Sequence, residues 1–186
     1  MKKTIDGRAL CAIAIAAAMP LAACGGEEGA ATGAEANPDS GRPEKATRKL
    51  ALGEETTLEG LENAAVKVKV TKVVDPMPNP KTERPKAGRR FVGVRMTIAN
   101  TSGKPYKDSL LNGSKLVTDV ADGANPSILL TGPCASKGAV GFRLPAGKSK
   151  SLCLPFQVKK KAKVSAFQFT MNSGFGGQTG EWAVAR

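Results

Sequence analysis

The chain has 186 residues, with 28 Lys and Arg against 16 Asp and Glu, so its formal net charge is +12. It contains no histidine, which excludes histidine-based triads, histidine general bases and histidine metal ligands. This length allows one ordinary domain with appendages, or two very small domains. With 41% hydrophobic residues, the chain can build a core.

Residues 1–23 have the pattern of a secretory signal. A basic start containing two lysines and an arginine precedes an apolar run from residue 9 to residue 23. The run is too short for a transmembrane helix, which needs about 20 apolar residues. It ends in Leu-Ala-Ala-Cys at residues 21–24, which resembles the lipobox of bacterial lipoproteins.

The lipobox resemblance implies that Cys24 receives a diacylglyceryl group and becomes the first mature residue. Two or more acyl chains give stable membrane anchoring, whereas one chain is marginal. We therefore expect the protein on the outer face of the bacterial cytoplasmic membrane, anchored through Cys24. The alternative is an ordinary signal peptide in which Cys24 is incidental.

Residues 24–47 have the composition of a linker. They lack large apolar side chains and carry two basic and five acidic residues. Such a segment cannot bury enough surface to offset its ordering entropy, so a flexible tether with a mean reach of roughly 25–30 Å is expected. Residues 48–186 carry 23 basic and 10 acidic residues, and this strongly basic part is the expected folded domain.

The hydrophobic pattern of residues 48–186 has a period of two. Strict alternation of apolar and polar residues predicts half-buried strands at 66–71, 92–98, 152–158 and 167–171. Shorter strands are expected at 50–52, 116–120, 128–130, 139–144 and 182–184. The proline-rich stretch 76–85 is a loop between two of these strands, either a stiff connector or a preformed recognition loop.

Seven to nine short strands over about 135 residues suggest two antiparallel sheets packed face to face. In residues 93–105 a strand runs into Asn-Thr-Ser-Gly-Lys-Pro, and in residues 144–158 Leu-Pro-Ala-Gly-Lys-Ser precedes a strand centred on Phe156. Together these segments resemble the immunoglobulin-like domain of unknown function found in many Gram-positive, especially actinobacterial, lipoproteins. That domain is similar in fold to a secreted mycobacterial immunoprotective antigen. The resemblance implies an all-β, immunoglobulin-like antiparallel β-sandwich and supplies no catalytic residues.

Three cysteines remain after signal cleavage, and lipidation of Cys24 would leave Cys134 and Cys153 as an even pair. In an oxidising compartment a disulfide between them is expected, and it would stabilise the fold by roughly 3 kcal/mol. The alternation around residues 152–156 places Cys153 on the outer face of its strand. The disulfide should therefore pin the loop that carries Cys134 onto the outside of the sandwich.

The densest basic run comprises Lys159, Lys160, Lys161 and Lys163, and it could form one patch with Lys148 and Lys150. Contact with anionic lipid or wall polymer is one interpretation of these lysines. A solvated turn is the other interpretation. Nucleic-acid binding is not expected, because aromatic residues are scarce and the chain has the pattern of an exported protein.

No segment predicts an enzyme. Gly147-Lys148-Ser149 lacks the preceding glycine of a phosphate-binding loop and leads into a strand. Neither a cofactor nor a metal site is expected. We therefore predict a non-catalytic binding or protein-interaction module with an unknown protein partner. The alternative is an electrostatic binder of anionic cell-envelope polymer or lipid headgroups.

Overall fold

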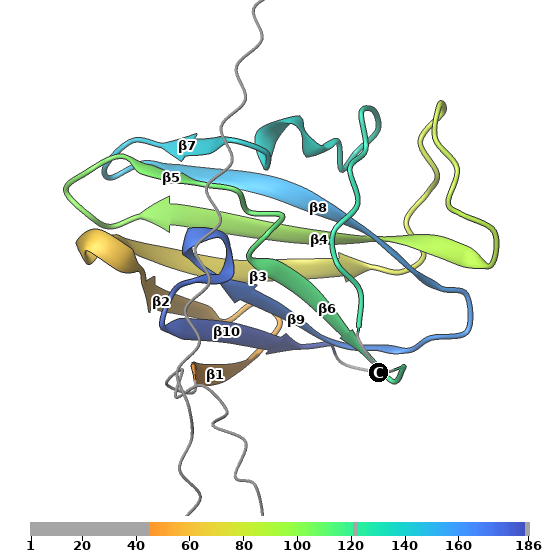
Figure 1. Cartoon of the computed structure of the whole chain (residues 1–186), viewed down its shortest axis with the longest axis horizontal. Helices are drawn as coiled ribbons and strands as arrows, with labels where there is room; N and C mark the ends of the chain where they lie inside the picture. Colours follow the sequence, from red (N-terminus) through yellow and green to blue (C-terminus); the bar gives the residue numbers. More distant parts are fainter. Residues whose placement is uncertain (1–44, 121–122, 185–186) are drawn as a thin grey trace, which may run out of the picture. The chain divides into compact units, whose positions relative to one another are not determined.

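The structure is a computed structural model, and it describes residues 45–120 and 123–184 (Figure 1). Ten strands make up the described part, which is an all-β sandwich as predicted. The first sheet contains, in spatial order, β1 (Ala46–Ala51), β10 (Gln178–Ala183), β9 (Val164–Thr170) and β6 (Ser114–Thr118). The second contains β2 (Glu55–Glu59), β3 (Ala65–Val74), β4 (Arg89–Asn100) and β8 (Ser149–Lys159).

A small third sheet pairs β5 (Tyr106–Asp108) with β7 (Phe142–Leu144). Three short 3-10 turns complete the described structure: η1 (Leu61–Asn63), η2 (Ser136–Gly138) and η3 (Asn172–Gly174). All strand pairs are antiparallel except β1 with β10, which are parallel over six registered residue pairs. The parallel pair departs from the purely antiparallel sandwich expected from the sequence.

All four long predicted strands are present, as β3, β4, β8 and β9. Four of the five shorter ones correspond to β1, β6, β7 and β10, whereas the strand predicted at 128–130 is wrong. That segment turns Leu129 inward and leaves Ile128 and Leu130 exposed, and it is not paired as a strand. β2 and β5 were not predicted, because β2 has only Leu58 as a large apolar residue and β5 has only three residues.

The core lies between the two sheets. Phe156 of β8 meets Phe167 of β9 edge-to-face with ring centroids 6.1 Å apart, and Phe167 lies 6.1 Å from Trp182 of β10. All three side chains are fully buried, and the Trp182 indole donates a hydrogen bond to the carbonyl of Glu54. Burial of these large aromatic rings contributes strongly to the hydrophobic stabilisation of the sandwich.

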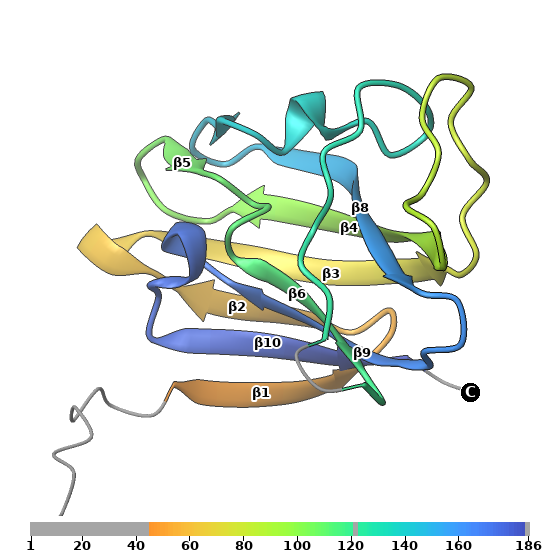
Figure 2. The ribbon, with the colours of Figure 1, turned by 45° about the vertical axis from the view of Figure 1, so that its right-hand side comes forward.

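The strands run between two ends of the sandwich, which we name here (Figure 2). The entry pole contains the beginning of β1, the turns η1 and η3, and the loops 101–105 and 145–148. The lysine pole contains the β3–β4 loop (75–88) and the β8–β9 turn (160–163). At about 3.3 Å per residue, the twelve residues of β4 separate the poles by roughly 40 Å.

Candidate functional site

The four predicted lysines lie at the lysine pole. Lys159 ends β8, Lys160 and Lys161 form the turn, and Lys163 precedes β9. All four are exposed, and within the described residues none of them forms a salt bridge. The turn is closed by hydrogen bonds from the Lys160 amide to the Gly88 carbonyl and from the Ala162 amide to the Lys159 carbonyl.

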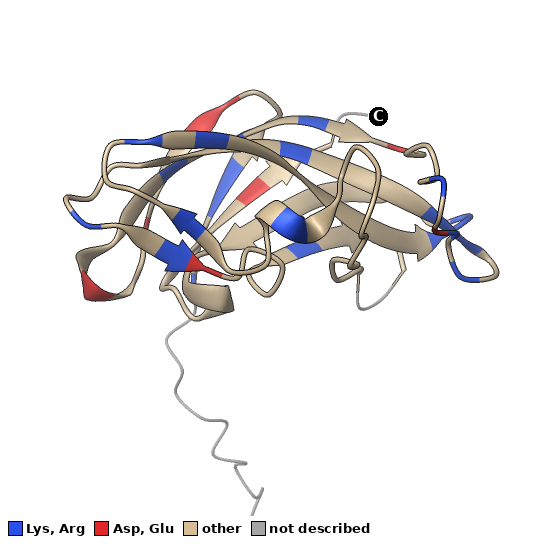
Figure 3. Ribbon diagram, turned by 90° about the horizontal axis from the view of Figure 1, so that it is seen from above, with Lys and Arg blue, Asp and Glu red and all other residues tan. Residues whose placement is uncertain are grey.

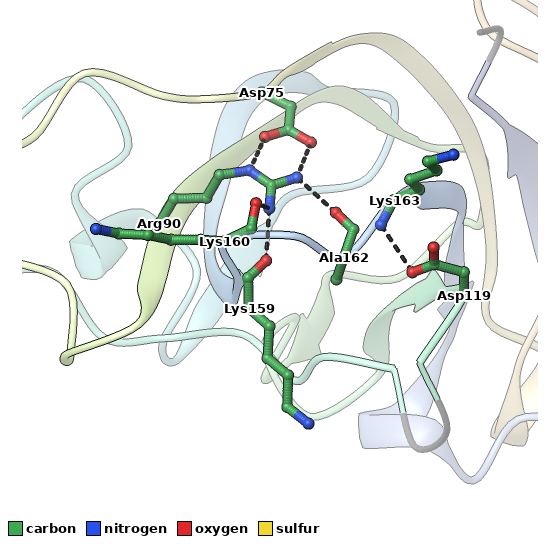
Figure 4. A network of polar contacts seen from close by, with 7 residues as sticks. All are labelled: Asp75, Arg90, Asp119, Lys159, Lys160, Ala162 and Lys163. Carbon is green, nitrogen blue, oxygen red and sulfur yellow. Dashed lines mark hydrogen bonds and ion pairs between the residues drawn. The ribbon is translucent and has the colours of Figure 1, made fainter.

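A single arginine fastens this turn to the rest of the sandwich (Figure 4). The Arg90 guanidinium donates to both carboxylate oxygens of Asp75, at 2.6 and 2.7 Å. It also donates to the carbonyls of Lys159, Lys160 and Ala162, at 2.6, 2.9 and 2.9 Å. These contacts use all five N–H donors of the guanidinium. Arg90 therefore shapes the turn and has no donor left for an external anion.

The hydrogen bonds with Asp75 raise the pKa of Arg90, so its charge is fixed. Asp119 performs a similar task at the other side of the turn. Its carboxylate accepts a hydrogen bond from the Lys163 amide at 2.8 Å, and its own amide donates to the Lys163 carbonyl at 3.1 Å. Both acidic residues hold backbone in place, and the lysine ammonium groups remain free.

The lysine side chains diverge. In Figure 4 the ammonium groups of Lys159, Lys160 and Lys163 point in three different directions. Lys159 borders a hollow of about 280 Å³ beside Arg89, whereas Lys160 borders a separate hollow of about 500 Å³ along the proline-rich loop. The four lysines therefore form a diffuse positive surface and not a convergent site for one small anion.

The prediction that these lysines form one patch with Lys148 and Lys150 is wrong. Lys150 pairs with Ile98 near the opposite end of β8, and its ammonium group lies 5.6 Å from the centre of the Phe142 ring. Lys148 lies at the entry pole, where its carbonyl accepts a hydrogen bond from Asn100. Lys148 and Lys150 lie at the start of the eleven-residue strand β8, and Lys159 lies at its end. The prediction treated proximity in sequence as proximity in space, but an extended strand keeps its two ends apart.

Cys134 and Cys153 form a disulfide, which supports the predicted pairing. Cys153 lies on the outer face of β8 opposite Arg95, and Cys134 lies in the loop that precedes η2. Around the disulfide a second apolar cluster forms from Met77, Phe91 and Leu129. The proline-rich loop thus contributes to a small outer core that the sequence analysis did not predict.

Glu83 ties the proline-rich loop to the disulfide-bearing loop. Its carboxylate accepts hydrogen bonds from the amides of Leu130 and Thr131 and from the hydroxyls of Thr82 and Thr131. These contacts, led by the two hydroxyl groups, lower the pKa of Glu83 from 4.5 to about 2. The ionised carboxylate therefore holds residues 130–131 in place at neutral pH.

The fixed segment presents two large aliphatic side chains to solvent. Ile128 is 68% exposed and Leu130 is 81% exposed, while Leu129 between them is buried. Ser127, which precedes them, borders a hollow of about 330 Å³ together with Lys86 and Arg89. We call Ile128 and Leu130 the apolar pair; Glu83 ties it to the proline-rich loop of the lysine pole. The signal for this site in the sequence was the Ile-Leu-Leu run, which was predicted to form a short strand.

Positive charge is not confined to this pole. Figure 3 shows Lys and Arg spread along the strands and at both ends, with fewer Asp and Glu among them. Cys24, the predicted lipidation site, lies outside the described residues. Within residues 45–120 and 123–184 there is no cluster of three or more Cys, Asp or Glu that could hold a metal ion. The same residues contain no helix long and apolar enough to cross a membrane.

No protein-family model matches the sequence, and no curated protein matches it either. Solved structures do show a similar fold. The YcdA protein of Bacillus subtilis, described as a candidate lipoprotein, is 17% identical with a TM-score of 0.51, over 70% of this chain and 38% of that one. The yjhA protein of the same species is 14% identical with a TM-score of 0.50, over 74% and 99% of the two chains.

A secreted protein of Mycobacterium tuberculosis, MPT63, is 17% identical with a TM-score of 0.49, over 74% of this chain and 98% of that one. At these identities the comparisons show the fold alone. The chain is therefore similar in fold to YcdA and yjhA.

Proposed function

We propose that this protein is a lipid-anchored, extracytoplasmic and non-catalytic module that binds another protein through the lysine pole. The observation that carries the proposal is the apolar pair, whose side chains are exposed although the segment that carries them is rigidly held. Protein interfaces combine an apolar centre with a polar rim, and the lysine pole has both. The partner surface should therefore be apolar at its centre and acidic at its edge.

Preorganisation of the apolar pair supports a binding role. The disulfide fixes the loop on the carboxyl side, Glu83 fixes residues 130–131, and the Ser127 amide donates to the Pro155 carbonyl at 2.7 Å. Since these contacts exist before any partner arrives, binding does not have to order the segment.

The location of the apolar pair agrees with a partner on the side away from the membrane. β1 begins at Ala46, at the entry pole, and 21 residues separate Ala46 from Cys24. A coil of that length has a mean reach of roughly 25–30 Å. This reach is shorter than the roughly 40 Å between the poles. An anchor at Cys24 would therefore keep the entry pole, on average, nearer the membrane than the lysine pole. The likeness to YcdA, a candidate lipoprotein, adds support for the anchor.

The test is crosslinking in intact cells, followed by mild-detergent purification of the native lipoprotein and mass spectrometry. We expect a near-stoichiometric partner that is lost in the variant Ile128→Ser/Leu130→Ser. The matched control is Val140→Ser, which removes another exposed apolar side chain that belongs to neither proposed contact surface. Retention of the partner by the first variant would refute the assignment of the apolar pair, provided that both variants unfold at the wild-type urea concentration.

A second candidate function is electrostatic binding of anionic wall polymer. It is favoured by the exposure of the four lysines and by their lack of salt bridges within the described residues. Replacing Lys159, Lys160, Lys161 and Lys163 with Gln should then abolish binding to purified wall polymer. The control removes the same charge elsewhere, by replacing Lys49, Lys69, Lys104 and Lys107 with Gln. Equal loss in both variants would indicate a nonspecific charge effect and exclude this function.

A further inference from the structure

Two more large apolar residues are exposed at the entry pole. Leu61 of η1 is 54% exposed, and Phe175, which follows η3, is 65% exposed. Both contact the same residue, because the Leu61 amide donates to Asn172 Oδ1 at 2.8 Å and the Phe175 amide donates to the Asn172 carbonyl at 3.0 Å. The two turns that carry these side chains are therefore neighbours in space, although they are more than 100 residues apart in sequence.

The backbone of both turns is unusual. Glu62 and Asn63 in η1, and Asn172 and Ser173 in η3, have φ between 54° and 59°. Within the described residues these are the only non-glycine residues with positive φ. Non-glycine residues in this region are strained, and such conformations persist where surrounding contacts impose them. The two turns that expose Leu61 and Phe175 therefore share the same left-handed backbone conformation.

Asp108 of β5 holds the η3 turn in this shape. Its carboxylate accepts hydrogen bonds from the amides of Asn172 and Ser173 and from the Ser173 hydroxyl, at 2.9, 2.7 and 3.0 Å. The Tyr106 hydroxyl also donates to it, and burial together with this carboxylate raises the pKa of Tyr106. Phe175 is thus presented to solvent by a fixed turn and not by a loose loop.

The chain enters the domain at this surface. The Lys45 ammonium group donates to the Gly174 carbonyl, one residue before Phe175, and β1 begins at Ala46. Lys104 and Lys107 border a hollow of about 270 Å³ next to Leu61. Glu59 and Glu62 lie at the same pole, so the local excess of positive charge is modest.

We infer that Leu61 and Phe175 contact the surface of an anionic lipid bilayer. The 44 residues that precede the described part join the domain beside the turns that carry these two side chains, so an anchor within that segment would tether the domain at this pole. Apolar side chains flanked by lysines suit the boundary between anionic headgroups and acyl chains. This inference rests on the proposed lipid anchor at Cys24, and it gives the tethered domain one preferred orientation.

The experiment places a tryptophan at each pole of the acylated full-length protein, reconstituted in phosphatidylglycerol-containing vesicles. Phe175→Trp reports on the entry pole, and Ile128→Trp is the matched control at the lysine pole. The native Trp182 is fully buried and gives the same background in both variants. Lipids brominated on their acyl chains quench only indoles that enter the bilayer.

We expect brominated lipid to reduce the added emission of Phe175→Trp at least twofold and to leave that of Ile128→Trp unchanged. Equal quenching of the two variants, or quenching of neither, would overturn the inference. Vesicle flotation and the intact mass of the same samples show whether the protein is acylated and bound to the vesicles. They therefore distinguish a missing membrane contact from a missing lipid anchor. Protein that floats with its acyl mass but shows no quenching refutes the membrane contact alone, whereas protein that carries no acyl group refutes both proposals.

Discussion

A Cβ atom added to Gly93 would lie 2.9 Å from the Sγ atom of Cys134. It would also lie 2.9 Å from the Sδ atom of Met77 and 3.3 Å from Cys153 Sγ. Gly93 thus provides the space on the outer face of β4 that the disulfide and the outer cluster occupy. We predict that Gly93→Ala lowers the free energy of unfolding by about 1–3 kcal/mol through overpacking.

Urea denaturation measures this effect, with Gly103→Ala as the control. Nothing lies within 4 Å of a Cβ atom at Gly103, and its φ is not positive. The control should therefore remain within about 0.5 kcal/mol of the wild type. Equal free energies of unfolding for Gly93→Ala and Gly103→Ala would show that a side chain at position 93 does not overpack against the disulfide.

Removal of the disulfide should affect the loop more than the core. Cys134→Ser/Cys153→Ser opens a link between residues 19 apart and should lower the free energy of unfolding by about 3 kcal/mol. Hydrogen exchange should increase in residues 126–134 and in the proline-rich loop, which share the outer cluster. Faster exchange throughout the sandwich, with no preference for these loops, would contradict the pinning role.

The Arg90–Asp75 pair should contribute strongly to stability, because the two side chains are only 20% and 25% exposed. Arg90→Ala leaves Asp75 and three carbonyl groups without their donor, and we predict a loss of about 2–3 kcal/mol in the free energy of unfolding. Arg95→Ala on the exposed face of the same strand is the control and should cost at most about 0.5 kcal/mol. Thermal unfolding of Arg90→Ala and Arg95→Ala under the same conditions tests this prediction.

Stability should depend on the ionisation of Glu83. Its pKa falls from 4.5 to about 2 on folding, so the ionised form is favoured in the folded state. The contribution of Glu83 is therefore complete above pH 4.5 and is lost as the pH falls from 4.5 towards 2. Wild type and Glu83→Gln should differ in stability at pH 6 and converge near pH 2. An NMR titration of the Leu130 amide with a midpoint near 4.5 would contradict the lowered pKa.

The sequence predicted the sandwich well because alternation reports on a strand with one buried face. β3, β4, β8 and β9 carry that pattern over their length, and the outward position of Cys153 follows from it. The pattern failed at 128–130, where Leu129 is buried by an outer cluster that arises only from loop docking. A run of three aliphatic residues does not show whether the segment pairs with a neighbouring strand or packs across the face of a sheet.

The candidate site was less predictable because it depends on contacts distant in sequence. The run of lysines was visible in the sequence. The shape of the turn that carries these lysines depends on Arg90 and Asp75, which lie at the two ends of the long β3–β4 loop. The apolar pair is held by Glu83, 47 residues away. Hydrogen bonds at such separations leave no local periodicity, so the residues that shape the lysine turn and hold the apolar pair became visible only in three dimensions.

The parallel pairing of β1 with β10 has a mechanical consequence. Tension applied through Lys45 pulls β1 along its own axis, while β10 is held within the sheet by β9. In this direction the six registered residue pairs are sheared together and do not open one after another. A domain that is pulled at its amino-terminal end and held at the lysine pole would therefore resist detachment of β1, the strand that carries the load.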